Sequence, residues 1–222
     1  MGSSGGATMY HRGQLMGFLQ DYLRENLGLY LFVILLFTIG VTFGALAIKT
    51  LDGEQKAELF SHLELFIQGI DLTIVSESNL PLQQSLQGNI KTMGLIWLLG
   101  LLVLGLPLVL LMLFTKGFAL GFTVGFLVQE LGYKGIIFSV ASVLPPNILL
   151  IPALIMMCVA AISFSLLIIR SRLALRKRGL YRQVLAFSST AVLAIAMGLI
   201  ASLIEVFVCP VFINLASGLF FQ

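Results

Sequence analysis

Charged and metal-binding residues are scarce in this sequence. Only 10% of its 222 residues are Asp, Glu, Lys or Arg, and it has two histidines and two cysteines. His11 and His62 stand alone, there is no HExxH zinc motif, and no two carboxylates share an apolar run. Hydrolytic and metal-dependent enzymes carry such groupings. We therefore expect no catalytic residue, no metal site and no bound cofactor.

The two cysteines also lack the neighbours that reactive thiols need. Cys158 and Cys209 lie in or next to apolar segments, without CxxC spacing or a nearby histidine. A disulfide, a metal site or a thiol nucleophile would each require such support. We interpret both residues as packing residues.

Long hydrophobic runs dominate instead. The chain is 59% hydrophobic with a mean hydropathy of +1.04. Uncharged apolar stretches of about 20 residues recur, and each could cross roughly 30 Å of hydrocarbon as a helix. The predicted fold is an all-α polytopic membrane protein. It would have about five transmembrane helices, a broken or re-entrant outer segment and amphipathic surface helices.

The predicted bundle covers residues 29–208 between an N-terminal tail with an amphipathic helix, 1–28, and a C-terminal tail, 209–222. The expected spans are about 29–48, 93–114, 116–130, 148–169 and 184–208.

Charge distribution predicts the orientation of these spans. The loop 170–183 holds six Lys or Arg and no acidic residue, so the positive-inside rule makes it cytoplasmic. We favour this over a nucleic-acid patch, because the loop is short and lies between two spans, and we expect no nucleic-acid partner. The N-terminus is then inside, the loop 49–92 and the C-terminus are outside, and Lys116 starts the third span at the cytoplasmic interface.

The outer loop contains an amphipathic pattern. Its apolar residues recur at helical spacing, at Leu59, Leu63, Phe66 and Ile70. Such a helix either lies on the membrane surface or forms a docking face for an extracytoplasmic partner.

Three glycines follow Lys116 at four-residue intervals, Gly117, Gly121 and Gly125. This spacing aligns them on one helix face, where two backbones can approach closely. A bare face can pack within the bundle or against a second copy in a homodimer. Because this is the shortest expected span, we expect it to hold a neighbouring helix of the same chain.

Two further features interrupt the apolar pattern. A helix arriving at Leu144 should stop, since prolines lack the backbone donor, and Asn147 could cap the next helix; the motif comprises Pro145, Pro146, Asn147 and Pro152. The second feature, Glu205, lies roughly 32 Å along a helix counted from Val184, near the outer interface. It is either a structural anchor, paired with Lys134 or a backbone N–H, or part of a transport path.

Four segments read in order resemble the stage II sporulation protein M family. They are LYLFVILLFTIGVTFGA, KGFALGFTVGFLVQELGYKG, SVLPPNILLIPA and EVFVCP. The resemblance extends over essentially the whole chain from about residue 20.

This resemblance implies a bacterial cytoplasmic membrane protein at the sporulation septum and the engulfing mother-cell membrane. It further implies a non-enzymatic scaffold for stage II sporulation proteins D and P, peptidoglycan hydrolases that remodel septal wall during forespore engulfment. The alternative is a channel or transporter for a small solute, built around the broken segment 130–147 and Glu205.

Overall fold

The computed structural model describes residues 6–61, 80–102, 105–174 and 180–209, and these residues form helices joined by short turns. Within these ranges there is no strand, so the predicted all-α class is confirmed. A short helix covers residues 53–61. The named elements are α1 (Gly6–Ala47), η1 (Ile48–Thr50), α3 (Leu80–Leu101), α4 (Leu106–Leu131), α5 (Tyr133–Ser142), α6 (Leu144–Ala174), α7 (Leu180–Leu203) and η3 (Ile204–Val208).

Among the described helices, four segments are long and apolar enough to cross a membrane. They are Asn26–Thr50, Leu106–Leu131, Leu144–Ile169 and Gln183–Val208. A further helix, α3, lies in the same bundle beside α6 and α7. Its first half is more polar, because it contains Gln87, Asn89 and Lys91. The polytopic membrane class is therefore confirmed.

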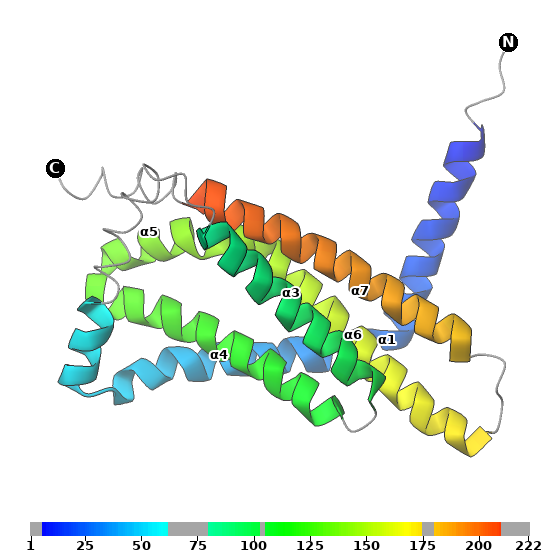
Figure 1. The fold of residues 1–222 in the computed structure, drawn as a ribbon, viewed down its shortest axis with the longest axis horizontal. Coiled ribbons are helices and arrows are strands. Elements are labelled where there is room, and N and C mark those ends of the chain that lie inside the picture. Colours follow the sequence, from blue (N-terminus) through cyan, green and yellow to red (C-terminus); the bar gives the residue numbers. More distant parts are fainter. Residues whose placement is uncertain (1–5, 62–79, 103–104, 175–179, 210–222) are drawn as a thin grey trace, which may run out of the picture.

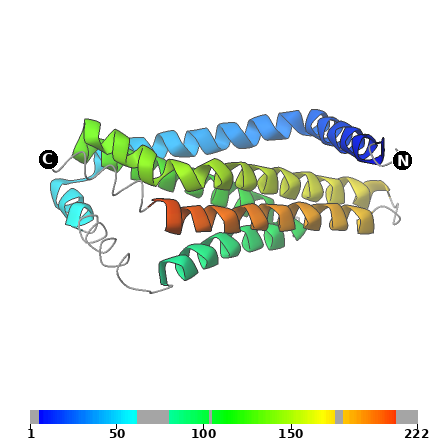
Figure 2. The same ribbon diagram turned by 90° about the horizontal axis from the view of Figure 1, so that it is seen from above.

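Helix α6 forms the centre of the bundle (Figures 1 and 2) and contacts α1, α3, α4 and α7. Its middle turns, residues 157–162, are fully or almost fully buried. The rings of Phe164 and Phe187 stack with centroids 5.0 Å apart, which joins α6 to α7. Small residues such as Ala160 and Ala161 let neighbouring helices approach α6 closely.

The most extensive helix contact joins α1 and α4, and glycines from both helices form it. A Cβ atom on Gly117 would come within 2.6 Å of the Phe37 carbonyl oxygen, and one on Gly121 would overlap the Val41 carbonyl. From the α1 side, a Cβ on Gly40 would lie 2.6 Å from the Phe114 carbonyl oxygen of α4. Real Cβ atoms do not approach backbone so closely. The two backbones can therefore touch only because these side chains are missing.

The glycine contact also gives the direction of the two helices. Gly117 lies against Phe37 in α1, and Gly125 lies against Ala45. Residue numbers therefore increase in the same direction along both helices, so α1 and α4 run parallel. The glycine face of α4 thus packs against another helix of the same chain.

The predicted boundary between the second and third spans is wrong. The expected spans 93–114 and 116–130 are replaced by α3 and α4, and the turn between them includes Gly105. Gly105 donates its N–H to the Leu102 carbonyl at 2.8 Å, and Pro107 occupies the first turn of α4. Proline suits this position because no acceptor is available there for an amide proton. Lys116 does not interrupt the helix, so it lies inside α4 rather than at its start.

The helix break predicted near Leu144 lies slightly earlier in the structure. After Gly132, whose φ of 58° is left-handed, α5 folds back along the last turns of α4. A Cβ on Gly135 would overlap the Leu127 backbone. Helix α5 ends at Ser142 and α6 begins at Leu144. The two prolines therefore lie in the first turn of α6, where they need no backbone donor.

The N-terminal region is continuous with the first span. Residues 1–28 were expected to form a separate tail and amphipathic helix, but α1 runs without interruption from Gly6 to Ala47. Its first part diverges from the bundle, whereas its second part lies along α4 (Figure 1). Asn26 marks the start of the second part and accepts a hydrogen bond from the Ser163 hydroxyl of α6 at 2.9 Å.

We predict that Gly121→Leu lowers the stability of the single chain by about 1–3 kcal/mol or more, because the new side chain must displace the α1 backbone. Gly44→Leu should act similarly from the other helix, since its Cβ would overlap the Phe118 carbonyl. Thermal unfolding in detergent would measure both effects. Gly94→Leu is the matched control, because no atom lies within 4 Å of its added Cβ. A Gly121→Leu chain that kept its stability and only lost self-association would contradict this prediction.

Candidate functional site

Polar side chains gather at the end of the bundle where α3 begins and η3 ends, which we call the η3 end. Ser85 and Asn89 come from α3, and Ser202 and Glu205 come from α7 and η3. The α5–α6 break lies close by, because Cys209 packs against Leu127 and Phe138.

Hydrogen bonds between α3 and α7 connect the two helices at several levels. The Ser85 hydroxyl donates to the Glu205 carboxylate. Further along α3, the Asn89 amide donates to the Ser202 hydroxyl oxygen at 2.8 Å, and the Trp97 indole N–H donates to the Ser188 hydroxyl oxygen at 3.4 Å. Position numbers rise on α3 as they fall on α7, so the two helices are antiparallel.

Asn89 and Ser202 form the buried part of this contact. Both side chains are buried. The Asn89 amide also donates to the Gly198 carbonyl at 3.4 Å, and the Ser202 hydroxyl donates to the same carbonyl at 3.1 Å. A buried amide without partners would be costly. Neither buried side chain is left unsatisfied in the described structure, which explains how α3 carries polar residues inside the bundle.

Glu205 lies where α7 changes into the π-helical turn η3. Its side chain is exposed. Lys134 or a backbone N–H was the partner expected from the sequence, whereas the partner in the structure is the Ser85 hydroxyl. Single π-helical turns often occur at functional sites. A carboxylate that meets a hydroxyl rather than a cation keeps its negative charge available to another molecule.

The backbone carbonyls at the α5–α6 break accept hydrogen bonds from side chains. In a regular helix the N–H of residue 146 would donate to the Ser142 carbonyl, but Pro146 has no N–H. The Cys209 thiol donates to that carbonyl instead, at 3.3 Å. The Asn147 amide donates to the Val143 carbonyl at 2.7 Å. Asn147 and Cys209 therefore stabilise a break that lipid would not tolerate unshielded. The third proline, Pro152, lies inside α6.

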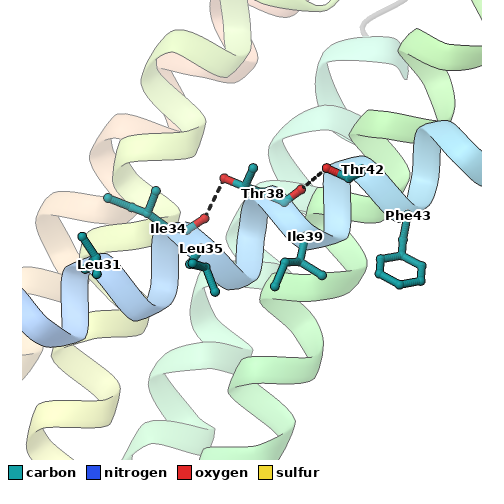
Figure 3. Close-up of a pocket in the computed structure, with 7 residues that line it drawn as sticks. All are labelled: Leu31, Ile34, Leu35, Thr38, Ile39, Thr42 and Phe43. Atoms are coloured by element: carbon teal, nitrogen blue, oxygen red, sulfur yellow. Dashed lines mark hydrogen bonds between the residues drawn. The ribbon is translucent and has the colours of Figure 1, made fainter.

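A shallow groove of about 530 Å³ runs along the outer face of α1 (Figure 3). Its only hydroxyls belong to Thr38 and Thr42, which donate to the Ile34 and Thr38 carbonyls of their own helix at 2.9 Å. The groove therefore offers no free donor to a polar ligand, and its composition suits lipid chains. Its lining consists of Leu31, Ile34, Leu35, Thr38, Ile39, Thr42 and Phe43.

Some predicted residues lie elsewhere. Leu59 is half-buried in the helix at 53–61, while Leu63, Phe66 and Ile70 lie outside the described residues, as do the side chains of the basic segment 170–182. Cys158 is fully buried in the core around α6.

Gly40 and Gly44 of α1 were not predicted as contact residues, although they share the four-residue spacing of the α4 glycines. Ser85 and Asn89 were not predicted either. Short polar residues are common in helices, so neither had a signal of its own.

The family model for stage II sporulation protein M matches residues 33–210. The chain belongs to the stage II sporulation protein M family. The match includes the spans of α4, α6 and α7, most of the span of α1, and both partners of the Ser85–Glu205 hydrogen bond. No curated protein and no solved structure was found to match the chain. The family resemblance recognised in the sequence is thus confirmed, and it identifies a sporulation-related membrane protein.

We predict that Asn89→Ala lowers the stability of this sporulation-family protein by about 1–2 kcal/mol, because it removes a buried donor and leaves a cavity between α3 and α7. In a double-mutant cycle with Ser202→Ala, we expect a coupling energy of about 0.5–2 kcal/mol. Thermal unfolding in detergent would measure the cycle. Ser189→Ala is the control, since that exposed hydroxyl donates only to its own helix. Strict additivity of the Asn89 and Ser202 variants would contradict the assigned hydrogen bond.

Proposed function

We propose that this chain is a non-enzymatic membrane scaffold for the peptidoglycan hydrolases of the sporulation septum. Its partners would be stage II sporulation proteins D and P, during engulfment of the forespore. Membership of the sporulation family supports the process. The observation that carries the scaffold role is the collection of exposed acidic side chains at the η3 end.

These acidic residues come from separate parts of the chain. Helices α1, α4 and α7 all end at the η3 end, and their exposed carboxylates lie on or just after them, at Asp52, Glu54, Glu58, Glu130 and Glu205. The basic segment 170–183 begins within the last turns of α6, at the opposite end of that helix. Because positive loops stay in the cytoplasm, we take the η3 end as the extracytoplasmic one, where wall hydrolases act.

The helix at 53–61 exposes an apolar side chain among these acidic residues. Phe60 is 41% exposed although it is a large aromatic residue. Leu59 lies beside it and is half-buried, and Glu58 is exposed. Aromatic residues, phenylalanine included, are enriched at protein interfaces, whose rims are polar. This surface suits a partner whose contact region combines basic and apolar side chains.

We predict that Phe60→Ser reduces recovery of sporulation proteins D and P with this chain at least several-fold, because it removes the exposed aromatic contact. Affinity purification from sporulating-cell membranes, followed by quantification of both hydrolases, would measure it. Ala57→Ser is the matched control, since Ala57 is also exposed on the same helix. The variant should keep the thermal stability of the parent chain. Equal recovery of both hydrolases with Phe60→Ser would count against docking at this helix.

The alternative is a small-solute channel or transporter, which the exposed Glu205 in a π-helical turn favours. Ion pathways through broken helices use free carbonyls as ligands. Here the Ser142 and Val143 carbonyls are occupied by Cys209 and Asn147, so we favour the scaffold.

On the scaffold proposal, Glu205→Gln should leave the permeability of proteoliposomes to ions and small solutes unchanged, because the carboxylate lines no conducting path. Fluxes of protons, monovalent cations and small organic solutes into vesicles containing either chain would test this. Protein-free vesicles give the background. A flux above background that Glu205→Gln abolishes would favour the transporter.

A further inference from the structure

Lys116 lies in the middle of a membrane-spanning helix. It is ten residues after Leu106 and fifteen before Leu131 in α4, or ~15 Å from the start of the helix. The adjacent helix gives the same depth independently. Gly117 touches Phe37, which lies near the centre of the Asn26–Thr50 span. A charged group at this depth is expensive, and such groups are usually paired and functional.

No carboxylate whose side chain the structure describes neutralises this lysine. Lys116 forms no hydrogen bond or ion pair there. The carboxylates whose side chains the structure describes lie at or beyond the η3 ends of their helices. The one on the same helix, Glu130, is ~21 Å further along α4.

Lys116 lies at the edge of the α4 side that faces the bundle, since Ala119, three residues after it, is exposed. Val109 is seven residues before it and Leu127 is eleven residues after it, which places all three on one helix face. Val109 is 0% exposed and Leu127 is 3% exposed, whereas Lys116 is half-buried. Val109 belongs to the core around α6, and Leu127 packs against Phe138 of α5. Lys116 thus occupies a partly open position between two packed clusters.

A lipid phosphate does not suit this position. The hydrocarbon core is about 30 Å thick, so the head groups lie about 15 Å from a residue at its centre. This distance is longer than an extended lysine side chain, and snorkelling is effective near helix ends. The complementary group must therefore be an anion at the same depth, and proteins place anions there as carboxylates on transmembrane helices.

We propose that Lys116 is a binding site, within the bilayer, for a carboxylate carried by the transmembrane helix of another protein. Its ammonium group would pair with a Glu or Asp near the centre of that helix. The half-buried position of Lys116 leaves access for such a helix. The packed residues Val109 and Leu127 confine this access to the part of α4 between them. This site is separate from the extracytoplasmic surface of the proposed scaffold, and neither proposal requires the other.

A host–guest transmembrane peptide tests the site directly. A polyleucine helix with one central Glu, and its Gln counterpart, would be reconstituted with the full chain in vesicles of zwitterionic phosphatidylcholine. Energy transfer between labels on peptide and chain would measure association. We expect the Glu helix to bind about tenfold more tightly than the Gln helix, the size of a polar contact between membrane helices. Lys116→Leu should abolish this difference, and Lys116→Arg should retain it.

Lys91→Leu is the matched control, because Lys91 is an exposed lysine on α3. It should leave the preference for the Glu helix unchanged. Equal binding of the Glu and Gln helices to the parent chain would overturn the proposal. A preference that survives in Lys116→Leu would overturn it as well, because the carboxylate would then bind elsewhere.

Thermal stability of the isolated chain gives a second measurement. If the anion comes from another protein, Lys116→Leu should leave the melting temperature unchanged or raise it, since it removes an unpaired charge. A lowered melting temperature for Lys116→Leu, but not for Lys116→Arg, would mean that the chain supplies its own anion. That outcome would overturn the proposal.

Discussion

The direct backbone contact between α1 and α4 is the constraint on which the bundle depends. Lipid chains are as apolar as the side chains, so helices in a membrane associate through close packing and polar contacts rather than through burial from water. The bare faces of Gly40 and Gly44 on α1 and of Gly117 and Gly121 on α4 provide such packing. Because the two helices run parallel, the chain must return across the bundle between them, and α3 is the helix that does so.

This return explains why α3 can be more polar than its neighbours. Helix α3 packs against α6 and α7 and has little contact with α1. Its amide at Asn89 and its hydroxyl at Ser85 find partners on α7 and η3. At the other end of α3, the bare backbone of Gly100 lies against Ala161 of α6. The Ser165 hydroxyl donates to the Gly100 carbonyl at 3.0 Å. Polar residues in α3 thus provide attraction between helices where glycine packing is less extensive.

The sequence predicts the fold class well because transmembrane helices reveal themselves as apolar runs. The spans at α1, α6 and α7 could be located from composition alone. The α3–α4 boundary is harder to locate, because Lys116 interrupts the apolar run and suggests a membrane surface where the helix in fact continues. Gly105 and Pro107 carried the better signal, since both favour a turn followed by a helix start. The Ser85–Glu205 pair was also beyond sequence reasoning, because its members are 120 positions apart and serine is common in helices.

The two helix contacts also differ in how they could respond to a partner. Sliding α1 along α4 by one residue would drive side chains into backbone that now lies against Gly121 and Gly44, so this contact resists small shifts in register. The α3–α7 contact rests on hydrogen bonds, and a hydroxyl such as that of Ser85 can exchange one acceptor for another without a steric collision. Its outermost hydrogen bond involves Glu205, which is exposed. A ligand that competed for this carboxylate would therefore act on the α3–α7 side, while the α1–α4 pair stayed fixed.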